Sequence, residues 1–250
     1  MMINGKTILI TGASSGIGAA AVRLCAEAGA NLVISARRQE QLEAVKTSLP
    51  EAASRIKIFA GDIADPEFAE ASVKVAEDTF GGLDGAFNNA GTLGEMGPVP
   101  AMSLENWIDV LNTNLTSGFL AAKHQIPAMK KRGGGSIVFT SSFVGHTIGL
   151  PGMGAYAAAK AGLIGLTQVL AVEHGAESIR VNALLPGGTK TAMAGDDPAF
   201  HEYVAGLHAL KRMAGPEEIA RAALFLLSDA GSFVTGSAML CDGGNSITKA

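Results

Sequence analysis

The chain has 250 residues, enough to bury a large hydrophobic core, and one large α/β domain explains this length better than two small ones. Its 19 basic and 23 acidic residues give a net charge of −4, and no basic stripe suggests a nucleic-acid partner. Cys25 and Cys241 lie far apart and form no metal-ligand or redox spacing, which predicts thiols in a reducing cytoplasm and no metal site. We find no apolar signal core near the start. Glycines and Pro151 interrupt the uncharged run 133–159, so we expect a soluble, cytoplasmic protein without a membrane span.

Short apolar, β-branched runs alternate with helical patterns along the whole chain. Strands are predicted at 6–10, 31–35, 56–60, 83–87, 136–140, 180–185 and 236–241. Helices are predicted from the glycine-rich turn after the first strand to about 28, and at 38–48, 66–80, 103–131, 155–174 and 216–228. Such alternation favours a parallel sheet with helices on both faces. Without any linker or internal repeat, we expect residues 1–250 to form one α/β, doubly wound, Rossmann-type domain with a seven-stranded parallel sheet.

A glycine-rich turn, TGASSGIG at residues 11–18, lies between the first predicted strand and the first helix. Glycine permits a tight turn and a close approach of the backbone to a pyrophosphate, which then sits at the positive end of the helix. A plain strand–helix turn rich in small residues would use the same residue types. The position in a strand–helix–strand unit nevertheless favours a dinucleotide site.

The end of the second predicted strand bears on the choice of cofactor. An acidic residue there would bind the ribose 2′-hydroxyl of NAD, whereas an arginine accommodates the 2′-phosphate of NADP. The sequence has Arg37 and Arg38 at this point and no carboxylate before Glu40, while Ser14 and Ser15 supply hydroxyls on the facing loop. A solvated helix start is the alternative, although two cations oppose the helix dipole there. We therefore expect NADP(H), with NAD(H) as the alternative.

Residues 136–160 combine a strand, two serines, a Gly/Pro-rich loop and a helix start. Tyr156 and Lys160 stand four residues apart, so both project from one helix face. A free tyrosine has a pKa of about 10, and a nearby ammonium should lower the pKa towards that of a useful acid or base. The same pair on an ordinary helix would be a packing contact only.

Together, TGASSGIG, the NNAG of residues 88–91 and Tyr156-x-x-x-Lys160 resemble the short-chain dehydrogenase/reductase family over essentially the whole chain. The resemblance implies four catalytic residues: Asn114, Ser142, Tyr156 and Lys160. Asn112 competes with Asn114, but the step of seven from Trp107 matches the family at Asn114. Ser142 is preferred to Ser141 because family members use the second serine of such a pair. Here, however, the loop from Ser142 to Tyr156 is one residue longer than the family's.

The same resemblance, with the glycine-rich turn and the arginines, implies a set of cofactor-binding residues. Asp62 looks like the contact to the adenine ring, and the Pro-Gly turn after the sixth strand resembles the turn that meets the nicotinamide end. The full set is Gly12, Ser14, Ser15, Gly16, Ile17, Gly18, Arg37, Arg38, Asp62, Ile63, Asn89, Ala90, Gly91, Tyr156, Lys160, Pro186, Gly187, Thr189 and Thr191.

We therefore expect an NADP(H)-dependent oxidoreductase that transfers hydride between nicotinamide and a small-molecule carbonyl or secondary alcohol, with Tyr156 as general acid/base. The alternatives are a 3-oxoacyl-carrier-protein reductase and a catalytically silent nucleotide-binding protein. Lys130-Lys131-Arg132 could attract an acidic carrier protein, or be a solvated helix end.

Three further expectations concern a lid, a loop histidine and the assembly. The segment 188–214 is a candidate substrate lid, whose apolar residues at helical spacing could equally form an ordinary core face; they are Phe200, Tyr203, Val204, Leu207 and Leu210. His146 could touch substrate or be a solvated loop residue. The family resemblance implies a homotetramer joined through 103–131, 155–174 and the C-terminal strand.

Overall fold

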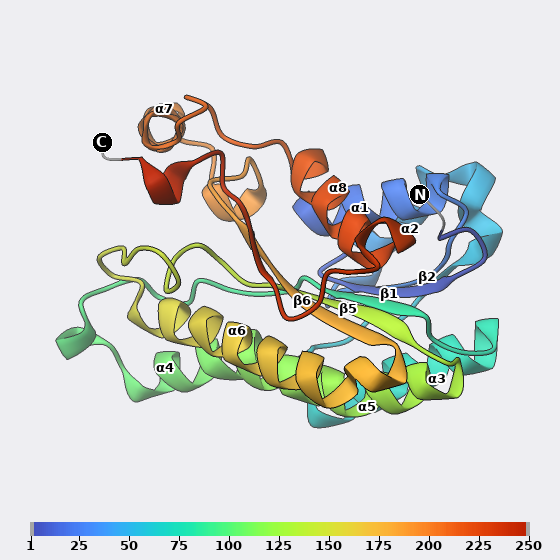
Figure 1. The fold of residues 1–250 in the computed structure, drawn as a ribbon. Coiled ribbons are helices and arrows are strands. Elements are labelled where there is room, and N and C mark those ends of the chain that lie inside the picture. Colours follow the sequence, from blue (N-terminus) through green and yellow to red (C-terminus); the bar gives the residue numbers. More distant parts are fainter. Residues whose placement is uncertain (1–2, 249–250) are drawn as a thin grey trace.

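The computed structural model describes residues 3–248 and contains one seven-stranded, fully parallel sheet in the order β3-β2-β1-β4-β5-β6-β7 (Figure 1). The strands are β1 (Thr7–Thr11), β2 (Asn31–Ser35), β3 (Ile56–Ile58), β4 (Gly85–Asn88), β5 (Gly135–Thr140), β6 (Ile179–Pro186) and β7 (Ala238–Cys241). The order reverses between β1 and β4, where ligands bind in open α/β sheets. The predicted doubly wound, Rossmann-type architecture is therefore confirmed.

Helices cover both faces of the sheet (Figure 1). On one face lie α1 (Gly16–Glu27), α2 (Gln39–Thr47) and α8 (Pro216–Leu227). On the other face lie α3 (Pro66–Phe80), α4 (Leu104–Leu111), α5 (Ser117–Lys131) and α6 (Gly154–His174). A further short helix, α7 (Pro198–Leu207), stands beyond the C-terminal edge of the sheet.

The side chains of each strand point alternately to the two faces of the sheet, so the hydrophobic core has one layer on each face. In β1, Ile8 and Ile10 pack with α1 and α8, whereas Leu9 packs with α3 and α5. Successive residues of a strand point to opposite faces, so a strand buried on both faces reads as a continuous apolar run. This explains why the sequence of β1, TILIT, is buried at every position.

The helix predicted at 103–131 contains an interruption. Residues Asn112–Thr116 form a π-helical turn between α4 and α5. The Asn114 side chain donates to the carbonyl oxygen of Val110 at 3.0 Å, one turn back, so an amide group supports the widened turn. Such π-turns frequently occur at functional sites.

The loose segment predicted at 187–214 contains α7, which has no buried residue. Of the expected apolar stripe, Phe200 is 47% exposed, Tyr203 65% and Leu210 63%, and Leu210 lies beyond the end of the helix. The stripe is therefore not an ordinary core face.

One helical stretch in the described part of the chain, residues 154–177, has the length and apolar composition of a membrane span. It begins inside the uncharged run 133–159 and continues past it through Lys160, Glu173 and Glu177. Of its most apolar window, 44% is buried inside the domain, and α6 packs against β6, as the core helix of a folded domain does.

Candidate active site

The glycine-rich turn after β1 is shaped by close backbone contacts. Gly12 and Gly16 have left-handed φ angles of 65° and 52°. A Cβ on Gly12 would lie 2.9 Å from Ala90 Cα, and one on Gly18 would lie 2.0 Å from the carbonyl oxygen of Gly12. The turn therefore needs glycine for close approach as well as for backbone conformation.

Helix α1 begins directly after this turn, and no side chain caps its first N–H groups. Ser15 occupies the N-cap position, but its side chain makes no capping hydrogen bond. The free N–H groups and the helix dipole of such an end suit a phosphate group. The residues present therefore fit a dinucleotide pyrophosphate.

Arg37 and Arg38 follow β2 as expected and are both exposed. Neither forms an ion pair within residues 3–248. Asp62 is exposed after β3 and accepts a hydrogen bond from the Ala64 N–H at 3.0 Å. These three charged groups remain available to a ligand at the β1–β2–β3 side of the sheet.

The NNAG turn after β4 connects the glycine-rich turn with the rest of the site. The Asn89 and Ala90 N–H groups donate to Thr11 Oγ1 at 3.1 and 3.2 Å. Thr140 Oγ1, at the end of β5, donates to Asn89 Oδ1 at 3.2 Å. The turn thus ties together the ends of β1, β4 and β5.

Two adjacent serines after β5 have different surroundings. Ser141 Oγ donates to the carbonyl oxygen of Lys160 at 2.7 Å, which anchors α6 to the strand end. Ser142 Oγ accepts from the Val144 N–H at 3.1 Å, and its hydroxyl lies near enough to Tyr156 to lower the pKa of that phenol. The structure therefore brings Ser142, and not Ser141, to the tyrosine, even with the longer loop.

Tyr156 and Lys160 lie on one face of α6, as the four-residue spacing predicts. Lys160 Nζ is 5.6 Å from the centre of the Tyr156 ring and donates to the carbonyl oxygen of Thr140 at 2.6 Å. Burial lowers the pKa of Lys160 to about 8. Burial also raises the pKa of Tyr156, while the Ser142 hydroxyl works in the opposite direction. The sequence suggested that the nearby ammonium would lower the pKa of Tyr156. In the structure the pKa is instead raised, because the effect of burial is larger.

Asn114 lies beside this pair but its side chain is fully engaged by the backbone. Its amide donates to Thr92 O at 2.8 Å and to Val110 O, and its oxygen accepts from the Thr92 N–H at 3.1 Å. A Cβ on Gly91 would lie 2.6 Å from Asn114 Oδ1 and 3.3 Å from Lys160 Nζ. Next to Asn114 is a cavity of about 20 Å³, which Thr11, Asn88 and Thr140 also line and which has room for one water molecule.

The segment that follows β6 lies against the glycine-rich turn. The Gly187 N–H donates to Cys241 O at 3.1 Å, and Thr189 Oγ1 donates to Gly187 O at 3.0 Å. A Cβ on Gly16 would lie 3.0 Å from the Thr191 methyl group. A surface cavity of about 440 Å³ opens beside Gly16 and Thr191.

Several residues outside the predicted site hold these parts together. Thr11 and Thr140 bind the NNAG turn through their hydroxyls, and both end a strand next to the site, a position that could have drawn attention to them. His208, which is 2% exposed, accepts a hydrogen bond from Gly188 and carries no local signal in the sequence.

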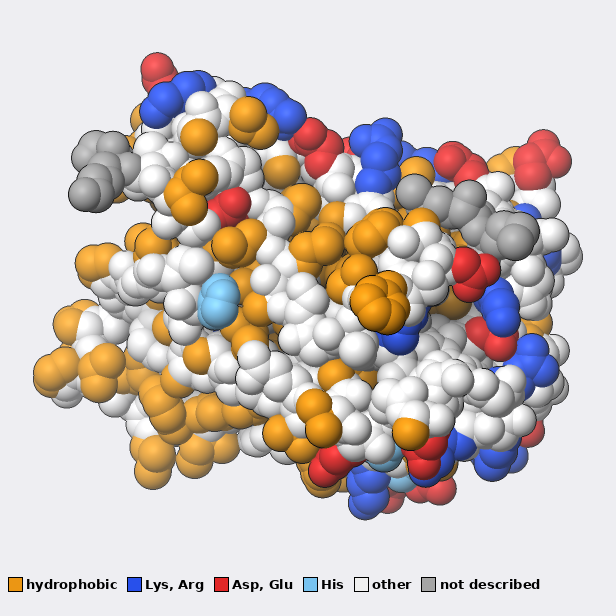
Figure 2. Space-filling view, in the orientation of Figure 1, with side chains coloured by type: hydrophobic (Ala, Val, Ile, Leu, Met, Phe, Trp, Pro, Cys, Tyr) orange, Lys and Arg blue, Asp and Glu red, His pale blue; other side chains and the backbone are white. Residues whose placement is uncertain are grey.

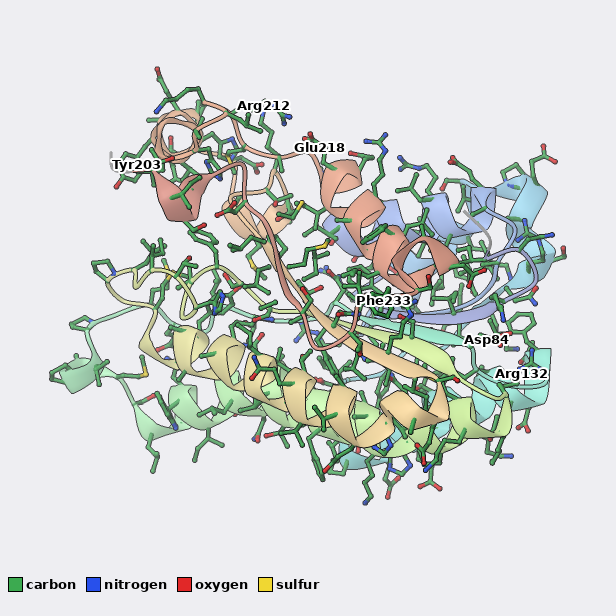
Figure 3. All side chains as sticks on the ribbon, in the orientation of Figure 1. Asp84, Arg132, Tyr203, Arg212, Glu218 and Phe233 are labelled. Atoms are coloured by element: carbon green, nitrogen blue, oxygen red, sulfur yellow. The ribbon has the colours of Figure 1, made fainter. Side chains whose placement is uncertain are left out.

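The basic cluster at the end of α5 is compensated by acidic partners. Lys130 pairs with Glu177, Lys131 with Glu77 at 2.8 Å, and Arg132 with Asp84 at 3.3 Å. Figure 3 shows Arg132 beside Asp84, at the opposite end of the sheet from α7. This cluster is therefore neither a free basic surface nor near the site.

Comparison with known proteins gives consistent matches along the chain. Residues 12–246 match the family model described as enoyl-(acyl carrier protein) reductase. The chain is 42% identical over 247 residues to a 2,5-dichloro-2,5-cyclohexadiene-1,4-diol dehydrogenase of Sphingobium indicum, with 97% of both chains covered. It is 39% identical to a cyclohexanol dehydrogenase of Acinetobacter sp., covering 96% of this chain and 94% of the relative. A solved short-chain type dehydrogenase/reductase from Mycobacterium marinum superposes with a TM-score of 0.93 at 33% identity, covering 99% of this chain and 98% of the other.

Proposed function

We propose that this chain, which belongs to the short-chain dehydrogenase/reductase family, interconverts a neutral cyclic secondary alcohol and its ketone with NADP(H). Members of this family of oxidoreductases use nicotinamide cofactors. The observation that carries the chemistry is the convergence of Ser142, Tyr156 and Lys160 beside the NNAG turn. The silent nucleotide-binding alternative lacks support because the acid–base group and its neighbouring cation are both present.

Tyr156 is the proton donor and acceptor in this proposal. Its phenol, kept protonated by burial, suits donation to a carbonyl oxygen in the reductive direction. Ser142 would hydrogen-bond the same substrate oxygen and orient it towards the phenol. In the oxidative direction the phenolate accepts the alcohol proton, and the Lys160 ammonium stabilises that phenolate by its charge.

The nicotinamide cofactor supplies or accepts the hydride when bound. The glycine-rich turn and the uncapped start of α1 would hold its pyrophosphate, and Gly187, Thr189 and Thr191 would line its nicotinamide half. Arg37, exposed and without an ion pair among residues 3–248, would form charge-assisted hydrogen bonds with the 2′-phosphate of NADP(H).

The substrate proposal combines the relatives' names with the character of the site. The two relatives described above act on a ring diol and on cyclohexanol, by their names. The segment 141–159, which carries Ser142 and Tyr156, has no Asp, Glu, Lys or Arg. Exposed apolar side chains, Met96, Val99 and Met193 among them, lie on the connections beyond the strand ends, partly in short 3-10 turns. Hydrophobic side chains gather at the lower left of the molecule in Figure 2, where α4 lies in Figure 1. A neutral, largely apolar ring suits such surroundings.

A carrier-bound 3-oxoacyl substrate receives less support. The description of the matching family model points towards carrier-bound substrates. A carrier protein is acidic in this hypothesis and needs a basic docking surface, yet Lys130, Lys131 and Arg132 are each paired with a carboxylate.

Two structural proposals accompany the chemistry. First, residues 188–214 act as a lid, because α7 has no buried residue and the 440 Å³ cavity separates α1 from the segment that leads into α7. Second, the chain assembles as a homotetramer through α4–α6 and β7, where exposed apolar side chains such as Phe119, Val169 and Val172 would be buried.

A substrate panel tests the proposed function. The purified protein should oxidise cyclohexanol with NADP+ at least about tenfold more efficiently, in kcat/KM, than a linear secondary alcohol of equal carbon number. A higher kcat/KM for a 3-oxoacyl thioester with NADPH would support the carrier alternative instead. The absence of cofactor-dependent turnover across the panel would refute the substrate proposal.

A further inference from the structure

His208, the first residue after α7, is a buried imidazole whose two ring nitrogens are both hydrogen-bonded. The Gly188 N–H donates to Nε2 at 3.0 Å, and Nδ1 lies 2.7 Å from the carbonyl oxygen of Val204. A backbone N–H can only donate and a carbonyl can only accept. The ring is therefore neutral, with its proton on Nδ1, and it links α7 to the turn after β6.

The glycines around the ring show how closely it is enclosed. A Cβ on Gly187 would lie 3.0 Å from Nε2, and a Cβ on Gly188 would lie 2.8 Å from Cε1. On the side of the last loop, a Cβ on Gly243 would lie 3.3 Å from Cδ2. Two backbone segments, the Pro-Gly-Gly turn and the last loop, thus pack on one side chain.

The surrounding backbone hydrogen bonds join the same segments. Gly187 donates to Cys241 O, Leu210 donates to Gly243 O, and Ala214 donates to Gly188 O. Downstream, Arg212 pairs with Glu218 through two contacts, which holds the far end of the segment to α8 (Figure 3). By contrast, Tyr203 of α7 is largely exposed and points away from the body of the domain in Figure 3. His208 is therefore the buried side chain at which α7 is fastened to the Pro-Gly-Gly turn.

We propose that His208 is a positioning residue, which sets the placement of the Gly187–Gly188 turn towards the cofactor and makes that placement depend on α7. This inference rests on the proposed function, because the turn is assigned to the nicotinamide half of the cofactor. His208 itself does not touch the reacting atoms. Its Nε2 determines where the Gly188 N–H points, and its Nδ1–H fixes the last turn of α7.

Two substitutions separate the two hydrogen bonds. His208→Gln places an amide oxygen near the position of Nε2, so that it can still accept from Gly188. His208→Asn is shorter, so that it can still donate to Val204 O but leaves the Gly188 N–H buried without an acceptor. An unsatisfied buried donor is costly, so we expect His208→Asn to weaken NADPH binding about tenfold and His208→Gln to restore it to within about threefold of the wild type. His124→Asn and His124→Gln, on α5 and outside the site, are the matched controls.

The experiment measures three quantities for each purified full-length variant: the NADPH dissociation constant by fluorescence titration, the rate of limited trypsin cleavage at Lys211 and Arg212, and the thermal midpoint. The proposal expects weak binding and faster cleavage in His208→Asn, recovered binding in His208→Gln, and no change in the His124 variants. Equal binding by both His208 variants and the wild type would overturn it. Losses of binding and thermal midpoint that are alike in Asn and Gln would also overturn it, because they would show a merely structural residue. Since binding and cleavage need no substrate, a failed substrate panel would leave this test intact.

Discussion

Lys160 Nζ donates a hydrogen bond of 2.6 Å to the carbonyl oxygen of Thr140, so the one buried cation of α6 is fixed to the end of β5. Ser141 reinforces this attachment from the other side, by donating to the backbone carbonyl of Lys160. The ammonium is thereby held over the Tyr156 ring in a desolvated position. Its protonation state should therefore respond to pH near neutrality, unlike that of an exposed lysine.

The first prediction concerns the pH dependence of cofactor capture. Burial lowers the pKa of Lys160 to about 8, so the free protein carries the ammonium below that pH and loses it above. If the ammonium supports binding and turnover, kcat/KM for NADPH should fall as pH rises through about 8. The guanidinium of Lys160→Arg stays protonated, so this variant should be less active but show no fall near pH 8. An identical fall in both proteins would exclude Lys160 as its origin.

The two serines after β5 give a second prediction. Ser142→Ala removes the hydroxyl next to Tyr156 and should lower kcat by about 10²-fold, as expected for one lost donor to the reacting oxygen. Ser141→Ala removes only the bond to α6 and should cost about 1 kcal/mol of unfolding free energy. Steady-state kinetics and denaturant unfolding of both variants provide the comparison. A larger loss of kcat in Ser141→Ala would reverse the assignment.

The glycine-rich turn supports a third prediction. Gly18→Ala would put a Cβ 2.0 Å from Gly12 O, so the turn must shift, and we expect a loss of roughly 1–3 kcal/mol together with weaker cofactor binding. Gly206→Ala on the exposed side of α7 meets no atom within 4 Å and should stabilise the chain by about 0.5–1 kcal/mol. Unfolding curves and NADPH titrations measure both effects. Unchanged binding in Gly18→Ala would argue against the pyrophosphate site.

Cofactor preference provides the fourth prediction. Arg37→Ala should weaken NADPH binding by about 10–100-fold, because a charge-assisted contact to the 2′-phosphate is lost. NADH lacks this phosphate, so its dissociation constant should stay within about twofold of the wild-type value. Arg38→Ala serves as the neighbouring comparison. Tighter binding of NADH than of NADPH by the wild-type protein would contradict the proposed preference.

The hydrophobic pattern was sufficient to predict the architecture, because buried parallel strands such as β1 read as short apolar runs between helical patterns. The interruption at Asn112–Thr116 could not be predicted, since it depends on the Asn114 side chain bonding to Val110 within an otherwise regular helical pattern. The distinction between Ser141 and Ser142 rested on family resemblance, whereas the structure separates them by the atoms that each hydroxyl meets.

The anchoring of the 187–214 segment was also beyond sequence reasoning. The helical spacing of Phe200 and Tyr203 suggested an apolar face but could not show that both remain exposed. The partner of His208, Gly188, lies 20 residues away and follows β6, whereas His208 follows α7. Long-range contacts of this kind leave no local pattern.

The central claim is that Tyr156 transfers the proton while the neighbouring groups hold the cofactor. Tyr156→Phe keeps the ring beneath Lys160 Nζ and removes only the hydroxyl, so NADPH binding should remain within about threefold of the wild type, whereas kcat for cyclohexanol oxidation should fall at least about 10³-fold. Paired titration and steady-state assays of this one variant are the most direct test. A variant that binds NADPH normally but retains a tenth or more of the wild-type kcat would contradict the account.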